Sequence, residues 1–592
     1  MAAAVHPPFL ACAVLAGLAG IQAAGAQPRP VPAAARPNVI LIITDDQGYG
    51  DIGAHGNPVI RTPHLDRLAR QSVRLTDFHV DPTCSPTRAA LLTGRYSTRT
   101  GVWHTILGRS LMAARERTVA ELFARGGYRT AMAGKWHLGD NYPHRPHDRG
   151  FEEAFYHGGG VVGQVGDDMG NDLYDDTYLR NGVPEAVKGY ATDVWFDDAL
   201  RFVEKSRAQP FFLYLATNAA HWPYYVDQAY VDPYLEAGVP PTMARFYGMI
   251  TNIDENVGRL RARLDELGLS ENTVLIFMTD NGSGEGWSNW QKEPGRFEGF
   301  NAGMRAGKGS QYDGGHRVPF YVHWPTGGLV GDREVPLLSA HIDVLPTLAE
   351  LCGLDLSGWP ALDGASLVPV LRAAPGATAT GALADRVLFV HSQRVDVPIK
   401  WRQSAVMTER WRLVNGVELY DIETDPGQKT DLAASHPAVV QRLRDAYEGW
   451  WTSLEPAFDD TARIAIGSEK ENPVALTSHD WRTDDDRQSV WNANQVNSGH
   501  PGNGHWALDV VRGGQYEIEL RRWPRPSHLG IDARRARLRV GEQELEKTLS
   551  PYDPSATFRV TLGPGPTTLQ SWLTGRRGES RGAYFVYVRR VE

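Results

Sequence analysis

Cysteine is scarce in this chain. Only Cys12, Cys84 and Cys352 occur among 592 residues, which excludes a scaffold held together by many disulfides. Cys352 lies in the apolar helical pattern LAELCGL and is predicted to be a small core residue. Cys84 stands in DPTCSPTR, a setting that suits neither a disulfide nor an apolar core. A Cys84–Cys352 disulfide and a free or chemically altered Cys84 are both compatible with this pattern.

Long basic blocks are also lacking. The chain has 61 Lys and Arg residues against 70 Asp and Glu residues, and its formal net charge is −9. This balance argues against a nucleic-acid partner, because such a partner needs a concentrated positive surface. It does not exclude an anionic substrate, since a single site can be locally basic.

Long apolar runs are missing outside the N-terminus. Phe9 to Ala24 is apolar and small, and Ala24-Gly25-Ala26 fits a cleavage site before Gln27, so residues 1–26 are predicted to be a secretory signal peptide. Cys12 would leave with it. A membrane anchor is the alternative, but the run is short for a span and ends in Pro-rich sequence. We expect a secreted or periplasmic protein with no membrane span in its mature chain.

The length of the chain predicts two to four domains. Residues 37–330 alternate apolar runs with helical patterns, which predicts an α/β domain with a doubly wound, mostly parallel sheet. Residues 331–465 are predicted to form a smaller α+β subdomain. From residue 466 to 592, short alternating segments separated by Gly, Pro, Asn and Asp predict an all-β, sandwich-like accessory domain.

Polar residues follow four apolar runs of the first domain, at the point where each predicted strand ends. The runs are Asn38 to Thr44, Arg129 to Ala133, Phe211 to Ala216 and Thr273 to Thr279. The residues that follow them are Asp45 and Asp46, Lys135 and His137, Asn218 and His221, and Asp280 and Asn281. In open α/β sheets, ligands bind outside the carboxyl ends of the strands. The sequence therefore predicts one shared site at this edge.

Oxygen ligands are prominent at this edge. Carboxylates and an amide carbonyl suit Ca²⁺ or Mg²⁺ rather than zinc, and two adjacent acids would repel each other without a cation. The predicted ligands are Asp45, Asp46, Asp280 and Asn281. Each alone could be a turn or capping residue, but two such pairs at two strand ends favour a metal site.

Positive and titratable groups complete the candidate set. They are Arg88, Lys135, Lys308, His137 and His221. Cations can hold the nonbridging oxygens of an oxyanion ester, while a histidine protonates the leaving oxygen. Lys308 lies in RAGKGSQYDGGHRVP, whose glycines allow the backbone to approach a ligand closely.

Taken together, these motifs resemble a family. CSPTRAALLTGR, from Cys84 to Arg95, matches the C-x-P-x-R signature of type I, formylglycine-dependent sulfatases in the alkaline-phosphatase-like superfamily. NVILIITDDQGYGDIG, GYRTAMAGKWHLG, TNAAHWP, TDNG and GKGSQYDGGHRVP match in the family's order. The resemblance covers roughly residues 37–455, and the joint match is far more specific than C-x-P-x-R alone.

The resemblance implies a chemistry for Cys84. In the family, a formylglycine-generating enzyme oxidises this cysteine to Cα-formylglycine, and Pro86 and Arg88 occupy motif positions required for that modification. One hydroxyl of the hydrated aldehyde attacks sulfur in line and displaces the alcohol. The second hydroxyl then loses its proton, the aldehyde re-forms and sulfate leaves. A serine alkoxide lacks that second hydroxyl and would be left as a stable sulfate ester.

The resemblance also implies roles for the other candidates. Asp45, Asp46, Asp280 and Asn281, with the modified Cys84, correspond to the ligands of a calcium ion, with magnesium as the weaker alternative. Lys135 and Lys308 would hold sulfate oxygens, and Arg88 would brace the nucleophile. His137 would assist turnover of the hydrated aldehyde. His221 would be the general acid toward the leaving oxygen.

Two features depart from the family pattern or lie outside it. The run YHGGGVVGQVGDD offers His157 or Gln164 where the family often supplies one more sulfate contact. In the C-terminal domain, Trp481, Trp491 and Trp506 could stack on sugars, although aromatic residues in a sandwich more often belong to its core.

Sulfate-ester hydrolysis on a sulfated carbohydrate is the leading function, and an aryl sulfate is the other substrate class. Two rivals are a phosphodiester or phosphonate monoester hydrolase on the same scaffold, and a non-catalytic carbohydrate-binding protein. The loops expected to set specificity span residues 144–176, 222–241 and 285–305.

Overall fold

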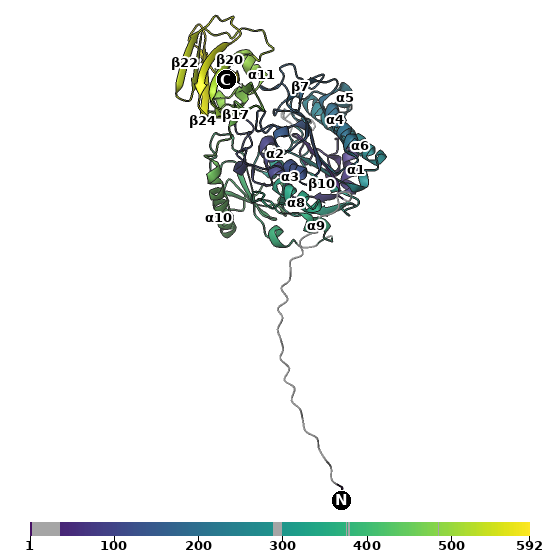
Figure 1. The fold of residues 1–592 in the computed structure, drawn as a ribbon. Helices are drawn as coiled ribbons and strands as arrows, with labels where there is room; N and C mark the ends of the chain where they lie inside the picture. The colour runs from purple at the N-terminus through teal and green to yellow at the C-terminus, as the bar shows by residue number, and fades with distance from the viewer. Residues whose placement is uncertain (3–35, 288–298, 375, 377–378, 484, 592) are drawn as a thin grey trace.

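The computed structural model describes residues 1–2, 36–287, 299–374, 376, 379–483 and 485–591 (Figure 1). The predicted signal peptide lies almost entirely outside these residues, as does part of the 285–305 loop. Within the described residues, none of the helices combines the length and the apolar character that crossing a bilayer requires.

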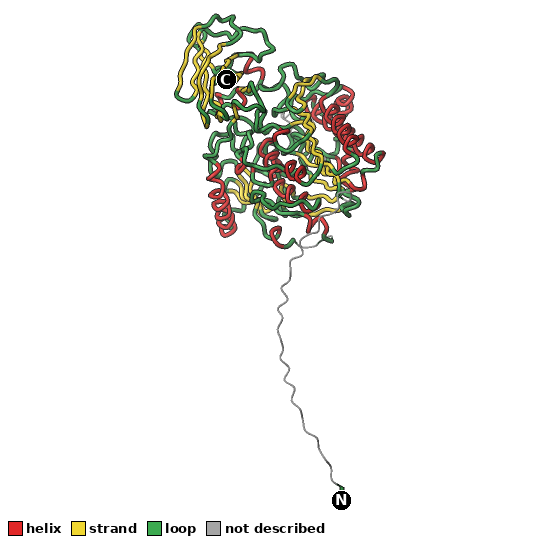
Figure 2. The backbone as a smooth tube through the Cα atoms, viewed as in Figure 1, coloured by secondary structure: helices red, strands yellow, loops and turns green. Residues whose placement is uncertain are grey.

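A ten-stranded sheet forms the centre of the molecule (Figure 2). Five neighbouring strands, β9, β1, β8, β4 and β5, run parallel, and β10 joins β9 antiparallel. In spatial order the strands are β11 (Arg333–Val335), β2 (Val73–Leu75), β10 (Phe320–His323), β9 (Thr273–Thr279), β1 (Asn38–Thr44), β8 (Phe211–Ala216), β4 (Arg129–Lys135), β5 (Glu153–His157), β6 (Thr177–Arg180) and β7 (Val183–Ala186).

Helices cover both faces of this sheet, because successive side chains of each central strand point in opposite directions. Leu41 and Ile43 of β1 enter one hydrophobic core, and Ile40 and Ile42 enter the other. On the first face lie α2 (Cys84–Thr93), α3 (Val119–Arg125), α8 (Val344–Leu351) and α9 (Val368–Arg372). On the second lie α1 (Pro63–Gln71), α4 (Ala191–Ser206), α5 (Gln228–Glu236) and α6 (Pro241–Glu266). The predicted doubly wound fold is confirmed.

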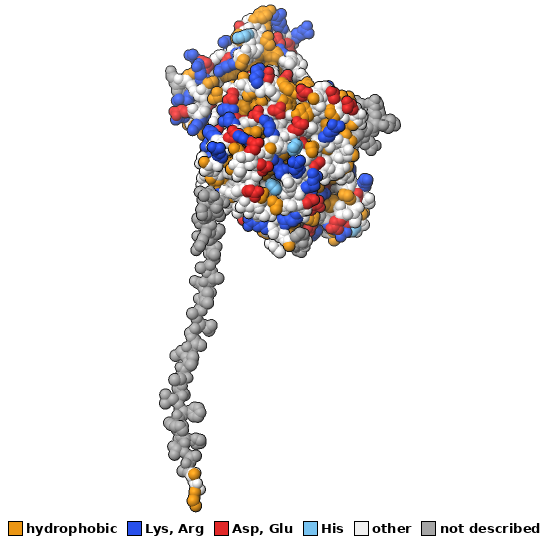
Figure 3. All heavy atoms as spheres, turned by 90° about the vertical axis from the view of Figure 1, so that its right-hand side faces the viewer, with side chains coloured by type: hydrophobic (Ala, Val, Ile, Leu, Met, Phe, Trp, Pro, Cys, Tyr) orange, Lys and Arg blue, Asp and Glu red, His pale blue; other side chains and the backbone are white. Residues whose placement is uncertain are grey.

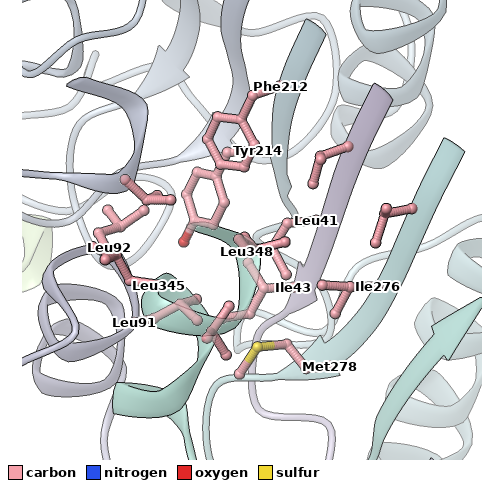
Figure 4. Close-up of a cluster of buried hydrophobic side chains, with 14 of the residues drawn as sticks. Leu41, Ile43, Leu91, Leu92, Phe212, Tyr214, Ile276, Met278, Leu345 and Leu348 are labelled. Atoms are coloured by element: carbon pink, nitrogen blue, oxygen red, sulfur yellow. The ribbon is translucent and has the colours of Figure 1, made fainter. Parts of the chain in front are cut away.

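Helix α8 belongs to the core of the large sheet, although its sequence pattern leads into the smaller predicted unit. Figure 4 shows Leu345 and Leu348 of α8 gathered with Leu91 and Leu92 of α2 and with Ile43 of β1. Cys352, at the end of α8, lies in the same core and is a free thiol. The predicted domain limits at residues 331 and 466 stay predictions.

A small antiparallel sheet stands beside this body. Its strands are β13 (Leu388–His391), β14 (Ser404–Met407), β15 (Trp411–Val414) and β16 (Glu418–Asp421). One face of this sheet packs against α10 (Pro437–Leu454). The hydrophobic core on its other face includes Ala340 of β12 (Ser339–Ala340), which pairs with β3 (Phe78–His79) in a two-stranded sheet. A short helix, α7 (Asp313–His316), precedes β10.

Two β-sheets share one hydrophobic core at the C-terminal end of the chain, which is the yellow part of Figure 1. One sheet contains β17 (Ile464–Ile466), β19 (His505–Val510), β24 (Gly565–Thr574), β21 (Arg535–Val540), β22 (Gln543–Thr548) and β25 (Ser580–Arg581). The other contains β18 (Val474–Thr477), β26 (Phe585–Arg590), β20 (Gly514–Arg521) and β23 (Ala556–Leu562). The predicted sandwich-like fold is confirmed. Trp481 and Trp506 are fully buried in this core, so neither is a platform for sugars.

The sandwich is joined to the α/β body by specific contacts. Ala465 N–H donates to the carbonyl of Tyr142 at 3.1 Å. Asn141 Nδ2 donates to Glu471 at 3.0 Å. Val165, from the loop after β5, enters the sandwich core itself. On the face shown in Figure 3, acidic and basic side chains of the described residues are interspersed, as the small net charge of the chain leads one to expect.

Candidate active site

Four parallel strands deliver the predicted residues to one edge of the large sheet. Asp45 and Asp46 follow β1, and Asp280 and Asn281 follow β9. Hydrogen bonds continue the pairing beyond the strand ends: Asp280 N–H donates to the carbonyl of Thr44 and Asp45 N–H to that of Ala219, both at 3.0 Å. The acids are therefore held by backbone as rigid as the strands.

Lys135 is the last residue of β4, which runs two residues further than the apolar pattern predicts. His137 follows it with a φ of 59°, a left-handed conformation that turns the chain sharply at the strand end. Gly160 packs against the imidazole ring of His137, because a Cβ at Gly160 would lie 2.2 Å from His137 Cε1. His221 lies beyond the end of β8.

Cys84 is the first residue of α2 and is buried. Its Sγ lies 3.4 Å from Asp45 Oδ1 and 3.6 Å from Asn281 Oδ1. Every residue of α2 is buried, so the helix that carries Cys84 is fixed by the core shown in Figure 4. Cys84 and Cys352 are both free thiols, so the alternative of a disulfide between them is wrong.

Three carboxylates surround the cysteine. Ligand atoms of Asp45, Asp46, Asp280 and Cys84 all lie within 4.8 Å of one another. Burial, and then the charge of Asp280, raises the pKa of Asp45 to about 8. Burial acts in the same direction on Asp280, but Arg88 and Lys135 outweigh it and hold the pKa of Asp280 below its usual value. The carboxylates repel one another in a place from which water is excluded.

Three cations balance these acids. Lys135 Nζ contacts a carboxylate oxygen of Asp45, and Lys308 Nζ lies 2.6 Å from Asp46 Oδ1. Arg88 Nη2 lies 2.8 Å from Asp280 Oδ2, and its Nη1 donates to the carbonyl of Lys135 at 3.1 Å. Side chains as buried as Arg88 and Asp280 need such partners, because an unpaired charge at this depth is very costly.

The donor set fits a hard divalent cation. Asp45, Asp46 and Asp280 supply carboxylate oxygens, and the Asn281 carbonyl oxygen faces the same space near Cys84. Burial, and then the charge of Asp280, disfavours the ionised form of Asp45, and a cation bound among these oxygens would favour it. Oxygen donors of this type suit Ca²⁺ and Mg²⁺.

The two histidines have different partners. His137 Nε2 lies 3.0 Å from the carbonyl of Thr105, and its Nδ1 is buried without a partner among the described residues. Burial, reinforced by Lys135, holds the pKa of His137 well below its usual value. His221 Nδ1–H donates to the carbonyl of Trp222 at 2.5 Å, and its Nε2 lies 3.6 Å from Asp46 Oδ2. Burial lowers the pKa of His221 to about 3, and Lys308 adds to this effect while Asp46 opposes it.

A cavity of about 430 Å³ opens onto Cys84. His137, His221 and Lys308 also line it, whereas the three carboxylates, Asn281, Arg88 and Lys135 lie beneath its surface. A larger cavity of about 890 Å³, lined by Arg61, Tyr190 and Tyr234 among others, contains none of the predicted residues. Size alone would therefore have selected the wrong cavity, and it is the chemistry of the walls that identifies this site.

Comparison with known proteins decides the family. Residues 37–354 match the family model described as sulfatase. This chain belongs to the sulfatase family. Human arylsulfatase A is 34% identical over an alignment of 467 residues, and the match covers 69% of this chain and 86% of the relative. Rat N-acetylgalactosamine-6-sulfatase is 30% identical and covers 73% of this chain and 81% of its own length.

A solved structure agrees with these relatives. The crystal structure of Ps i-CgsB in complex with k-i-k-neocarrahexaose superimposes with a TM-score of 0.59 at 27% identity, and covers 70% of this chain and 92% of the other. The resemblance to sulfatases in the alkaline-phosphatase-like superfamily is confirmed, and the chain is a sulfuric ester hydrolase.

The structure of this sulfatase separates the two candidates for an additional polar contact. His157 Nε2 lies 3.1 Å from Asp167, and His157 lies outside the walls of the 430 Å³ cavity. Gln164 lines that cavity, and its Nε2 is buried without a partner among the described residues. Gln164 is therefore the better placed of the two.

Several residues of the cavity wall had no signal in the sequence of the sulfatase. They are His104, Arg394, Arg402 and Gln403. The two arginines lie in the 392–403 loop between β13 and β14, and neither belongs to a motif or follows a strand of the large sheet. Only the packing of the small sheet against the α/β body brings them to the cavity.

Proposed function

We propose that this sulfatase hydrolyses sulfate esters on a carbohydrate, with a nucleophile made from Cys84 and a calcium ion bound beneath it. The observation that supports this most directly is the position of Cys84, at the wall of a cavity of about 430 Å³ and within 3.6 Å of two predicted metal ligands. His221 and Lys308 line the same cavity, so a leaving group and a sulfate can both be reached from one bound position.

The cysteine as such is poorly suited to attack. Burial, and then the charge of Asp45, raises the pKa of the Cys84 thiol above its ordinary value, so the thiolate is disfavoured. We propose that a formylglycine-generating enzyme converts Cys84 to formylglycine, whose hydrate supplies an oxygen nucleophile and a second hydroxyl for sulfate release. Arg88, held by Asp280, would brace that group.

Calcium would be held by Asp45, Asp46, Asp280 and Asn281, with the modified Cys84 as a further ligand; magnesium is the weaker alternative. The ion would supply Lewis-acid stabilisation of negative charge at the reacting centre. Asp45 and Asp46 pair with Lys135 and Lys308 in this structure. Once the two carboxylates held a cation instead, both ammonium groups would be free to hold sulfate oxygens.

The histidines would move protons. His221 lies at the cavity wall, where its Nε2 can reach the leaving oxygen of a bound ester. A bound sulfate would favour the protonated imidazole, because a nearby negative charge raises the pKa of histidine. His137 lines the same cavity, its Nδ1 has no partner among the described residues, and it is the candidate that assists turnover of the hydrated aldehyde.

A carbohydrate substrate is supported by the comparisons. One relative is named for N-acetylgalactosamine 6-sulfate, and the superimposed crystal structure contains an oligosaccharide. Aryl sulfates are the other substrate class, since human arylsulfatase A is also similar. Export to the periplasm or the exterior, by way of the predicted signal peptide, is part of the proposal.

The test begins with a peptide mass spectrum covering Cys84, from protein made together with a formylglycine-generating enzyme. We expect a formylglycine mass, and sulfate released from sulfated sugars by the wild type but not by Cys84→Ala. Rates on 4-nitrophenyl sulfate and on an aryl phosphodiester would separate sulfatase from phosphodiesterase activity. Modified protein that binds a glycan but releases no sulfate from any substrate would contradict the proposal.

A further inference from the structure

The cavity wall continues beyond the residues assigned to sulfate. Its other members come from four parts of the chain. The loop after the short helix η3 (Ser97–Thr100) supplies His104, the loop after β5 supplies Gln164, the 392–403 loop of the small sheet supplies Arg394 and Arg402, and the sandwich supplies Trp491. They form a wall that the chemistry at Cys84 does not use, and we call these five residues the distal wall.

Charge on the cavity surface is of one sign. Lys308, Arg394 and Arg402 line it, and no Asp or Glu does so among the described residues. Arg402 Nη1 donates to the carbonyl of Ser392 at 2.6 Å, which holds the guanidinium in place. Burial, and then Arg394, Arg402 and Lys308, lowers the pKa of His104 to about 3, so the three cations act on one small region. A guanidinium recognises carboxylate and sulfate groups by paired hydrogen bonds.

The loop that carries Arg394 is fastened by the sandwich. Arg482 Nη2 donates to both carboxylate oxygens of Asp396, at 2.9 Å to Oδ1 and 3.0 Å to Oδ2. Arg109, from the α/β body, lies 3.1 Å from the same Asp396. Since Asp396 is two residues from Arg394, this joint fixes the position of the arginine relative to Cys84.

The sandwich also supplies a side chain directly. Trp491 is partly exposed and lines the cavity, unlike Trp481 and Trp506 in the core. Its backbone is held on both sides: its carbonyl accepts from Val165 N–H at 3.0 Å, and its own N–H donates to Gln495 Oε1 at 2.9 Å. Gln164 Oε1 accepts from Val161 N–H at 3.0 Å, and its Nε2 has no partner among the described residues. An indole and this free N–H donor on one cavity surface are suited to a sugar ring, which presents an apolar face and hydroxyl acceptors.

We infer that the distal wall is a second subsite, which binds a sugar carrying another anionic group besides the ester that is hydrolysed, either a carboxylate or a second sulfate. Arg394 and Arg402 bind that group, Trp491 and Gln164 bind the ring, and the C-terminal domain is thereby part of the substrate site. The inference rests on the proposed function and deepens it from sulfated carbohydrate to a carbohydrate with at least two anionic groups.

Kinetics with the matured full-length chain test the arginines. The substrates are 4-nitrophenyl sulfate, a monosulfated monosaccharide, the same sugar with a second sulfate, and a sulfated disaccharide that contains a uronate. For Arg394→Gln and Arg402→Gln, we expect the ratio of kcat/KM for doubly to singly anionic sugars to fall about tenfold, mainly through KM. Lys400→Gln is the control, since this exposed lysine lies in the same loop and pairs with Glu448. A ratio unchanged in both arginine variants would overturn the inference.

The two anion classes are separated by the last two substrates. A loss larger on the uronate than on the disulfated sugar identifies a carboxylate, and the reverse identifies a second sulfate; either supports the subsite. If the wild type turns over 4-nitrophenyl sulfate but does not prefer any doubly anionic sugar, the subsite fails and the proposed function stands. If no substrate releases sulfate, both fail.

Variants of the sandwich test its share of the site. We expect Trp491→Ala to lower kcat/KM on sugars by about five- to tenfold relative to 4-nitrophenyl sulfate, and Trp491→Phe to restore most of it. Arg482→Gln should raise KM for doubly anionic sugars more than it changes kcat, because Arg482 acts only by positioning the arginine loop. Equal losses on every substrate would show a merely structural role and would contradict this part of the inference.

Discussion

Two buried clusters in this protein look alike as lists of residues and differ in what they can do. Asp45, Asp46, Asp280 and Cys84 form one, and Asp77, His79 and Asp313 form the other; in each, the ligand atoms lie within 4.8 Å of one another. The first lies beneath a cavity, and its partners are three separate cations from three elements. The second lies outside the walls of that cavity.

The guanidinium of Arg412 pairs with both carboxylates of the second cluster. Arg412, fully buried on β15, lies 2.9 Å from Asp77 Oδ1 and 3.1 Å from Asp313 Oδ1, and His79 Nε2 lies 2.9 Å from Asp77. Burial would raise the pKa of Asp77, but Arg412 and His79 outweigh it and hold that pKa below its usual value. This cluster fastens the small sheet to the α/β body. A group of buried acids is therefore a candidate active site only where a ligand can replace its internal partners.

The largest expected effect concerns the two free cysteines. Cys84→Ala should lower sulfate release by about 10⁴-fold or more, because it removes the precursor of the nucleophile. Cys352→Ala is the matched control: this residue lies in the hydrophobic core, so the variant should lose some thermal stability and keep its activity per folded molecule. Comparable activity losses in the two variants would contradict the assignment of Cys84, but not Cys352, as the precursor of the nucleophile.

Metal binding separates the two acid clusters next. Asp280→Asn should abolish calcium binding measured by calorimetry and lower kcat by about 10³-fold, since a ligand and its charge are lost. Asp77→Asn should bind calcium as the wild type does. Chelation should inactivate the wild type, with calcium restoring activity better than magnesium. If only Asp77→Asn lost calcium binding, the ion would belong to the second cluster, and the proposed metal site would be wrong.

A variant of the second cluster should lose folding stability and keep calcium binding. Arg412→Leu removes the buried guanidinium that pairs with both Asp77 and Asp313, and we expect the free energy of unfolding to fall by about 3–5 kcal/mol. Urea denaturation followed by fluorescence measures this. The folded fraction should still bind calcium with unchanged affinity. A variant as stable as the wild type would mean that the second cluster is not a structural joint.

The smallest expected effect comes from replacing His221, the proposed general acid at the cavity wall. His221→Ala should slow hydrolysis of a sugar sulfate by about 10²-fold and of 4-nitrophenyl sulfate by less than about tenfold, because an alkoxide needs a proton on leaving and a nitrophenolate does not. The slope of log(kcat/KM) against leaving-group pKa should steepen accordingly. Equal losses on both substrates would rule out this role.

Much of the fold follows from local patterns. The strands β1, β8 and β9 match their apolar runs end to end, because a strand buried on both faces must be continuously apolar. β22 had no such signal: apart from Leu545, its residues Gln543–Thr548 are polar, and almost all are exposed at the edge of a sheet. β17 is only three residues long and pairs parallel with β19, which no short-range pattern specifies.

The sequence by itself determined the floor of the site. Each acid, lysine or histidine there lies within a few residues of a buried strand end or in a recognisable motif, and parallel strands bring their carboxyl ends together whatever the loops do. The tertiary structure alone decided the rest of the walls. Trp481 and Trp506 are buried in the core of the sandwich, whereas Trp491 lies at the surface of the cavity. Gln164 reaches the cavity from the loop after β5. Arg394, Arg402 and Trp491 reach it because the small sheet and the sandwich pack against the sheet edge, and such contacts between distant segments leave no periodic mark in the chain.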